Sequence, residues 1–150
     1  MKFRNLLAVM ALSLCAMSCS DDDTTLGDLV KGDYKGTTDM SVMNSNSSFE
    51  SVATIAAQDD DHVILVLPAA LGEAKAMEMP AIKVENVNIA KTGENSYSLE
   101  IDAIDVVVND VNYVSDGLKG SIKNDSLFLN YAVKPGAMPM PIHFSFKGKR

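Results

Sequence analysis

Cysteine is nearly absent from this chain and tryptophan is missing altogether, and the first absence limits how the protein can be stabilised. The two cysteines of the 150-residue sequence are Cys15 and Cys19, both near the N-terminus. No cysteine remains after residue 19, which excludes an internal disulfide framework in the rest of the chain. The stability of any domain there must therefore come from packing.

Basic charge is also scarce. The sequence has 13 lysine and arginine residues against 20 acidic residues, a net charge of −7. Without Lys2 and Arg4 of the N-terminal segment, 11 basic residues remain and the net charge is −9. Nucleic acids and anionic lipid surfaces select basic proteins, so the composition argues against nucleic acid as a partner and against direct adsorption to a membrane.

Catalytic signatures are missing as well. The sequence has no Gly-x-Ser-x-Gly elbow, phosphate-binding loop, dinucleotide glycine pattern or paired His-x-x-x-His. Its two histidines, His62 and His143, fall at the end of an acidic turn and on the polar face of an expected strand. We therefore expect a protein that is not an enzyme and that has no cofactor.

Two groups of residues could offer metal ligands, but neither is favoured as a metal site. Asp59, Asp60 and Asp61 offer oxygen ligands, but they lack the spacing and the terminal glutamate of a calcium loop. Met138 and Met140 offer soft sulfur ligands for Cu(I) beside His143. Because these methionines share the apolar phase of their segment, packing is the preferred interpretation, and no metal is expected.

The N-terminus reads as a secretory signal over residues 1–18. Lys2 and Arg4 precede an apolar run over residues 6–14, and Ala16 and Ser18 supply the small residues of a cleavage site before Cys19. The apolar run is well short of the ~20 residues that span a bilayer. A cleaved signal is therefore expected rather than a retained membrane helix.

The residues around the cleavage site carry a resemblance to bacterial lipoproteins. Ala16-Met17-Ser18-Cys19 resembles a lipobox, and the acidic segment after it resembles the surface-export signal of Bacteroidota lipoproteins. The resemblance implies acylation of Cys19 and an outer-membrane, cell-surface location. Residues 19–27 are then a tether of at most ~30 Å. The export signal would consist of Ser20, Asp21, Asp22 and Asp23.

Hydrophobic periodicity after the tether is two rather than 3.6, which predicts antiparallel strands with one buried face. The expected strands cover residues 32–42, 48–58, 62–67, 71–77, 80–91, 96–108, 111–122 and a hairpin over 126–147. The alternation changes phase after Ala103 and again between Val84 and Val87, and both changes are interpreted as β-bulges. The pattern predicts an all-β, antiparallel up-and-down meander that closes into a small barrel of about eight strands.

Three segments carry a family resemblance over residues 28–150. They are Gly32-Asp33-Tyr34-Lys35-Gly36-Thr37, residues 80–89, and the C-terminal segment 140–148. Together they resemble the lipocalin-like (calycin-like) domain of Bacteroidota lipoproteins. In lipocalins proper a Gly-x-Trp motif opens the first strand, whereas this chain has tyrosine at residue 34. The resemblance implies a small barrel with no assigned function.

Two functions remain open at this point. Flexible methionines suit a cavity that accepts irregular apolar ligands, so the leading expectation is a barrel that binds a small apolar or amphipathic molecule. The alternative is a filled barrel that serves as an interaction or structural module for another envelope protein. The candidate cavity residues are Tyr34, Met40, Met138, Met140, Ile142 and Phe144.

Overall fold

Strands form nearly all of the part of the chain that the computed structural model describes, residues 24–70, 79–136 and 138–150. The expected strand over residues 71–77 lies outside this part. One short helix, α2 (Leu26–Val30), precedes the strands. The strands are β1 (Gly32–Val42), β2 (Ser45–Ala57), β3 (His62–Leu67), β4 (Ile82–Gly93), β5 (Ser96–Ile101), β6 (Ile104–Val108), β7 (Val111–Ser115), β8 (Leu118–Lys123), β9 (Ser126–Pro135) and β10 (Ile142–Lys149).

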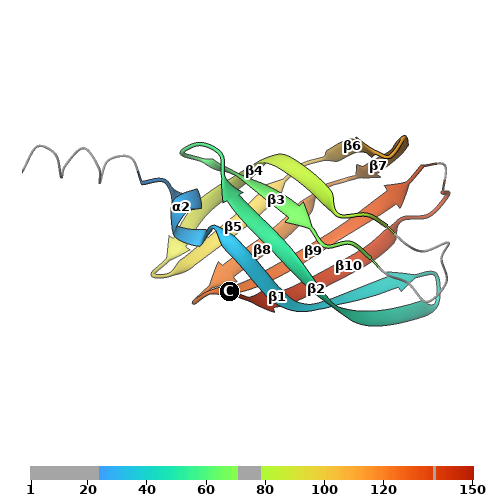
Figure 1. The fold of residues 1–150 in the computed structure, drawn as a ribbon, viewed down its shortest axis with the longest axis horizontal. Coiled ribbons are helices and arrows are strands. Elements are labelled where there is room, and N and C mark those ends of the chain that lie inside the picture. Colours follow the sequence, from blue (N-terminus) through green and yellow to red (C-terminus); the bar gives the residue numbers. More distant parts are fainter. Residues whose placement is uncertain (1–23, 71–78, 137) are drawn as a thin grey trace, which may run out of the picture.

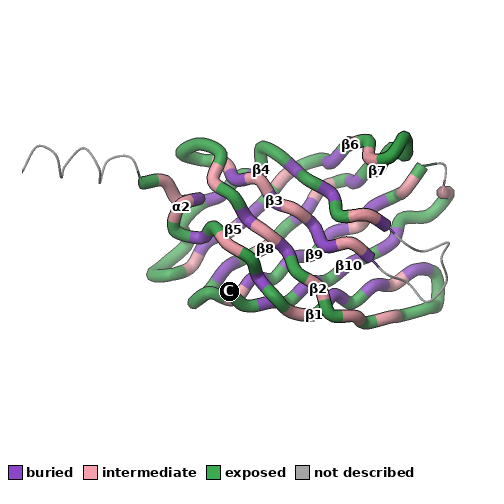
Figure 2. The backbone as a smooth tube through the Cα atoms, in the orientation of Figure 1, coloured by how far each residue is buried: buried purple, intermediate pink, exposed green. Residues whose placement is uncertain are grey.

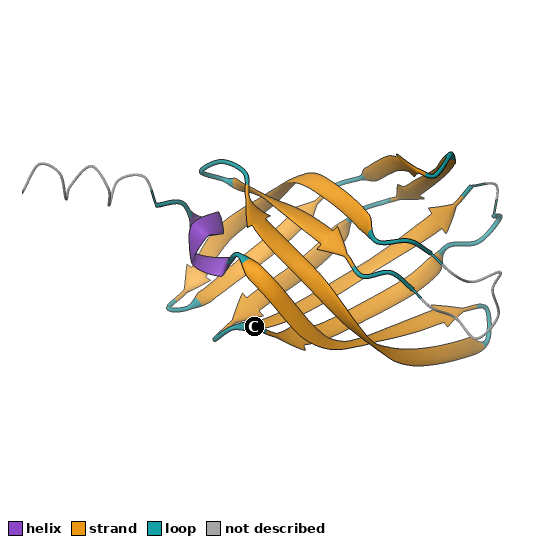
Figure 3. Cartoon of the chain, viewed as in Figure 1, coloured by secondary structure: helices purple, strands orange, loops and turns teal. Residues whose placement is uncertain are grey.

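Eight of these strands form a closed ring. The order β10-β1-β2-β3-β4-β5-β8-β9 is completed by pairing of β9 with β10, and all of the pairings are antiparallel. Figures 1 and 3 show the strands running obliquely around one barrel, with α2 at one end. Ring closure leaves no unpaired edge among these eight strands. The expected up-and-down barrel is confirmed.

Strands β6 and β7 form a hairpin that extends the β5–β8 pair beyond the ring. Ile101 of β5 pairs with Leu118 of β8, and three residues further along both strands Ile104 pairs with Ser115. The register is therefore the same on both sides of the interruption between β5 and β6, so the prediction of a β-bulge after Ala103 is wrong. Both strands leave the ladder at the same level instead, and Gly117 there has a φ of 136°, which favours glycine.

The second expected bulge is present in β4. Val63 of β3 pairs with Val87, whereas Leu65 pairs with Val84, so β4 has one extra residue between these pairs. Asn86 lies in this bulge with a φ of 62°, in the left-handed region that asparagine tolerates. Its side chain and backbone exchange hydrogen bonds of 2.7 and 2.8 Å with the amide of Gln58. The bulge explains why the alternation of β4 changes phase.

The core fills the inside of the ring. In β10 burial alternates without a fault: Ile142, Phe144 and Phe146 are buried, while the residues between them are exposed. The other strands of the ring contribute inward-facing aliphatic residues, and all of these side chains join one hydrophobic cluster. Figure 2 shows the resulting alternation of buried and exposed positions around the barrel. The period-two interpretation of the sequence holds.

Two glycines set the contact between the first and last strands. Gly36 of β1 pairs with Gly148 of β10. A Cβ atom at Gly36 would overlap the carbonyl oxygen of Lys147, and one at Gly148 would overlap the ring of Phe146. Larger residues at these positions would therefore force the strands apart where the ring closes.

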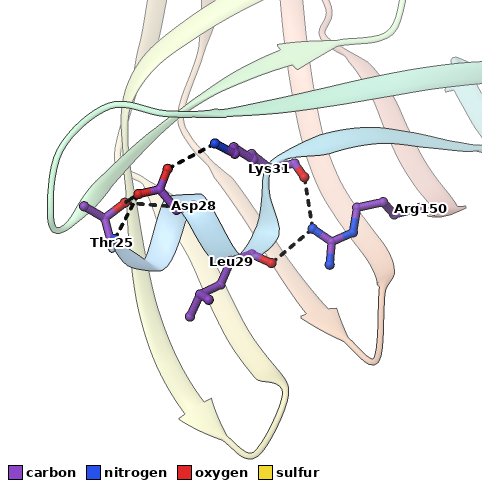
Figure 4. A network of polar contacts seen from close by, with 5 residues as sticks. All are labelled: Thr25, Asp28, Leu29, Lys31 and Arg150. Atoms are coloured by element: carbon purple, nitrogen blue, oxygen red, sulfur yellow. Dashed lines mark hydrogen bonds and ion pairs between the residues drawn. The ribbon is translucent and has the colours of Figure 1, made fainter. Parts of the chain in front are cut away.

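Helix α2 is held at the end of the barrel by a polar network that involves the last residue of the chain (Figure 4). Thr25 and Asp28 form a capping box, with hydrogen bonds of 3.2 and 3.0 Å in the two directions. The guanidinium of Arg150 donates to the carbonyl oxygens of Leu29 and Lys31, both at 3.0 Å. The helix thus begins at Leu26, inside the segment that the sequence assigned to the tether.

Truncation of Phe144 tests the assignment of inner and outer faces. Phe144 is 3% exposed and lies in the core, so Phe144→Ala should lower the free energy of unfolding by about 3–5 kcal/mol. His143→Ala is the matched control on the outer face and should cost less than ~1 kcal/mol. Chemical denaturation measures both, and similar losses at the two positions would contradict the described faces.

Candidate functional site

The proposed cavity residues fall into two groups in the structure. Tyr34, Met40, Ile142 and Phe144 are at most 3% exposed and belong to the core cluster. Met138 is partly buried and packs against that cluster. The inward side chains of the expected lining therefore lie inside the barrel, with almost no surface that water can reach.

Met140 differs from expectation. Its side chain is 43% exposed, so the predicted inward orientation is wrong. Strand β10 begins only at Ile142, and Pro139 and Pro141 flank Met140 in the bend before it. Proline lacks the backbone N–H that a ladder requires, so the alternating pattern of the sequence extends further than the strand itself.

Tyr34 is a core residue whose hydroxyl already has a hydrogen-bond partner within the protein, so it does not offer this group to a ligand. Its hydroxyl donates a 2.6 Å hydrogen bond to the carbonyl oxygen of Val30, at the end of α2. The guanidinium carbon of Arg150 lies 5.7 Å from the centre of the ring. Burial raises the pKa of Tyr34, and the charge of Arg150 partly opposes that shift. This tyrosine therefore joins β1 to the end of α2 and to Arg150.

Tyr131 is the unusual polar group of the interior. Its ring stacks on that of Phe144, with centroids 5.1 Å apart and planes inclined by 19°. Its hydroxyl is buried and has no hydrogen-bond partner among the described residues. Desolvation by burial raises the pKa of this hydroxyl. An unsatisfied buried hydroxyl costs stability, typically ~1–3 kcal/mol.

A large hollow of the described structure lies on the outer face of the barrel, with a volume of about 760 Å³. Three consecutive residues from each of four strands line it, namely 39–41 of β1, 46–48 of β2, 130–132 of β9 and 143–145 of β10. The central residues of three triplets, Met40, Tyr131 and Phe144, point inward and are buried, whereas Ser47 of β2 is partly exposed. The flanking side chains therefore point into the hollow from outside. We call this feature the outer hollow.

The outer hollow has polar side chains on a lining that is otherwise mostly apolar. Asp39 accepts a hydrogen bond from the hydroxyl of Ser48 across the β1–β2 pair. Ser145 and Asn130 continue the same row on β10 and β9. His143 lies opposite Ser41, and no hydrogen bond joins the two side chains among the described residues. The hollow thus presents donors and acceptors to a ligand, without a paired nucleophile and base.

The acidic corner before β3 is a structured turn. A carboxylate oxygen of Asp59 lies 2.8 Å from Nδ1 of His62 and accepts a 3.0 Å hydrogen bond from the backbone N–H of Asp61. The hydrogen bond from His62 is the main cause that lowers the pKa of Asp59. Within residues 24–70, 79–136 and 138–150, no three histidine, cysteine or acidic side chains lie close enough to hold a metal ion.

The predicted anchor and export signal, from Cys19 to Asp23, lie outside the described residues. No helix in the described part of the chain is long and apolar enough to cross a membrane. The outer hollow was missed because its residues come from four strands far apart in sequence. The sequence does show serine and asparagine residues at alternate, outward positions of β1, β2, β9 and β10, which could have indicated a polar outer surface there.

These observations define the class of protein: a small, closed, up-and-down β-barrel in which the described inward-facing side chains form one hydrophobic core. The chain belongs to the family of calycin-like β-barrel domains, whose sequence pattern matches residues 30–149. A similar fold is found in the crystal structure of a "putative outer membrane protein" from Bacteroides fragilis, at 25% identity and a TM-score of 0.71. That similarity covers 83% of this chain and 52% of the other, so this chain spans about half of that structure. No curated protein matches the sequence.

Removing the Tyr131 hydroxyl tests whether it is unsatisfied. Tyr131→Phe should raise the free energy of unfolding by about 1 kcal/mol, because it relieves an uncompensated desolvation. Tyr34→Phe is the matched control and should lower it by about 1 kcal/mol, because it deletes the hydrogen bond to Val30. Thermal or chemical denaturation measures both, and a loss of stability in both variants would show that Tyr131 has a partner.

Proposed function

We propose that this protein is a non-catalytic, lipid-anchored module of the outer membrane that binds through the outside of a filled barrel. The observation that carries the proposal is the closure of the interior. Side chains on opposite sides of the ring, including Ala53, Leu65, Ile82 and Leu129, are no more than 1% exposed. A barrel holding a small ligand needs an open lumen, whereas an eight-stranded barrel can also be filled by its own side chains.

The outer hollow supports the same choice. It is open to the outside and combines apolar surface with hydrogen-bonding groups, as surfaces that contact another protein do. The alternative, a carrier for a small apolar ligand, would need the methionine and phenylalanine side chains of the interior to surround free space. Met40 and Phe144 are instead buried against the core.

The location rests on two supports. The fold is similar to that of the Bacteroides fragilis "putative outer membrane protein" described above. The sequence before the barrel combines a short apolar run, small residues and Cys19, the features of a lipoprotein signal. Two or more acyl chains would give stable attachment, since a single chain binds only marginally. Surface display is inferred from the acidic residues that follow Cys19.

An apolar dye distinguishes the filled barrel from a carrier. The wild-type protein should show no stoichiometric uptake of an environment-sensitive fluorophore, and fatty acids should cause no displacement. Saturable binding of the dye by the wild-type chain at one molecule per barrel would favour the carrier and overturn the filled-barrel proposal.

Substitution of the acylated residue tests the anchor. Cys19→Ala should release the protein from the outer membrane or leave its signal uncleaved, because acylation requires the thiol. Cys15→Ala is the matched control and should be processed and anchored normally. Cell fractionation followed by mass measurement reports both variants. Normal processing and membrane retention of Cys19→Ala would show that Cys19 is not the site of attachment.

A further inference from the structure

One side of the barrel carries a concentration of basic residues that the overall charge conceals. The outward-facing positions of β8, β9 and β10 contain five lysines and no aspartate or glutamate. The neighbouring strand β1 adds Lys35, which pairs directly with Lys149, and it also carries the exposed Asp33 and Asp39 on either side of Lys35. We call this surface the lysine face, and its members are Lys35, Lys119, Lys123, Lys134, Lys147 and Lys149.

The register of the sheet brings several of these charges into adjacent rows. Lys123 lies opposite Ser126 of β9, which in turn lies opposite Lys149 of β10. Lys149 lies opposite Lys35, so three lysines occupy one row across four strands. Neighbouring strands are ~4.8 Å apart, and like charges directly opposite each other destabilise a sheet. The direct pairing of Lys35 with Lys149 therefore costs stability, and a function of this surface in binding would account for it.

Most lysines of the lysine face form no ion pair with a carboxylate among the described residues. Within the described residues, Lys119 is the one member of the lysine face that has a carboxylate within ion-pair distance, Glu100 at 3.7 Å. Glu50 of β2 lies in the same row as Lys147, two strands away, and Asp39 of β1 lies in the row that contains Lys119. The remaining charges are exposed and available to an anion from outside the chain.

An exposed aromatic residue lies within the lysine face. Phe128 of β9 points outward, is 37% exposed, and pairs with Lys147 of β10. The Lys147 ammonium lies 5.8 Å from the centre of the Phe128 ring. Basic residues beside an exposed aromatic ring are typical of surfaces that contact lipid headgroups, where the ring enters the boundary of the acyl chains.

The negative net charge of the chain does not oppose such a contact at short range. At physiological ionic strength the screening length is ~8 Å, whereas facing sheets are ~10 Å apart even before their outer side chains are counted. Acidic residues on the far side of the barrel are therefore largely screened from a surface that touches the lysine face. The net charge of the chain predicted that it would not lie on anionic lipid. That prediction rested on the sum of the charges and not on their distribution over the surface.

We propose that the lysine face docks on the anionic, phosphate-bearing headgroups of the membrane that anchors the protein. Charge complementarity selects an anionic occupant, and the length of the tether selects the membrane. Thr25, the N-cap of α2, is six residues from Cys19, a distance of at most ~20 Å. This choice of occupant rests on the proposed anchor at Cys19, which would hold the barrel beside a headgroup surface at all times.

Vesicle binding by a chain without its anchor tests the proposal. The chain from Ser20 to Arg150 retains the whole ring of strands and its core, and it lacks Cys19. It should bind vesicles of phosphatidylcholine and phosphatidylglycerol in equal parts, and it should not bind vesicles of phosphatidylcholine alone. Added salt should weaken the binding, because screening reduces interactions between exposed charges.

A pair of charge-matched variants identifies the surface. Lys147→Gln with Lys149→Gln should weaken binding to the anionic vesicles about 25-fold, since each lysine near such a surface contributes about fivefold. Lys83→Gln with Lys91→Gln makes the same change in net charge on β4, outside the lysine face, and should alter binding less than about twofold. Circular dichroism checks that both variants keep their strands.

Three outcomes would overturn the proposal. They are equal binding to the two kinds of vesicle, equal weakening by the two double variants, and binding to soluble polyglutamate without binding to vesicles. The last result would assign the lysine face to an acidic polymer or protein. Failure of the anchor is read separately, from fractionation of cells that express Cys19→Ala, so the two proposals fail in distinguishable ways.

Discussion

The pairing of the first strand with the last is the constraint on which the rest of the molecule depends. β1 and β10 pair continuously from Lys35–Lys149 to Ser41–His143, and the facing glycines Gly36 and Gly148 allow the strands to approach. Closure gives every strand of the ring two neighbours and directs one face of each strand to a common interior. The inward side chains of the described strands form one hydrophobic core, and both candidate surfaces lie on the outside of the barrel.

The sequence predicts the architecture well because burial on one face imposes a period of two wherever a strand crosses the ring. Prediction from the sequence fails where the alternation of apolar residues continues beyond the end of the strand or has more than one structural cause. Met140 follows the alternation of β10, yet the prolines beside it end the ladder, and the side chain turns to solvent. The change of phase after Ala103 is visible in the sequence, but a bulge and a simultaneous break in two strands produce the same pattern in one strand.

The candidate surfaces were harder to predict for a related reason. The outer hollow and the lysine face are both assembled across strands, so their members are close only once the order of the ring is known. Lys147 and Lys149 alternate with buried residues, and the same is true of Lys119 and Lys123, so each pair can be assigned an outward position from the sequence alone. The missing information is that β8, β9, β10 and β1 are neighbours. The net charge is a sum over the whole chain, so it does not show that the lysine face is basic.

The contacts of Arg150 tie the docking of α2 to the closure of the ring. Its guanidinium donates to the carbonyl oxygens of Leu29 and Lys31, and its backbone N–H donates to the carbonyl oxygen of Asp125. Because Arg150 directly follows β10, these contacts require β10 to be in place between β9 and β1. The position of the short helix therefore reports, at one end of the barrel, whether the strands farthest apart in the sequence have paired.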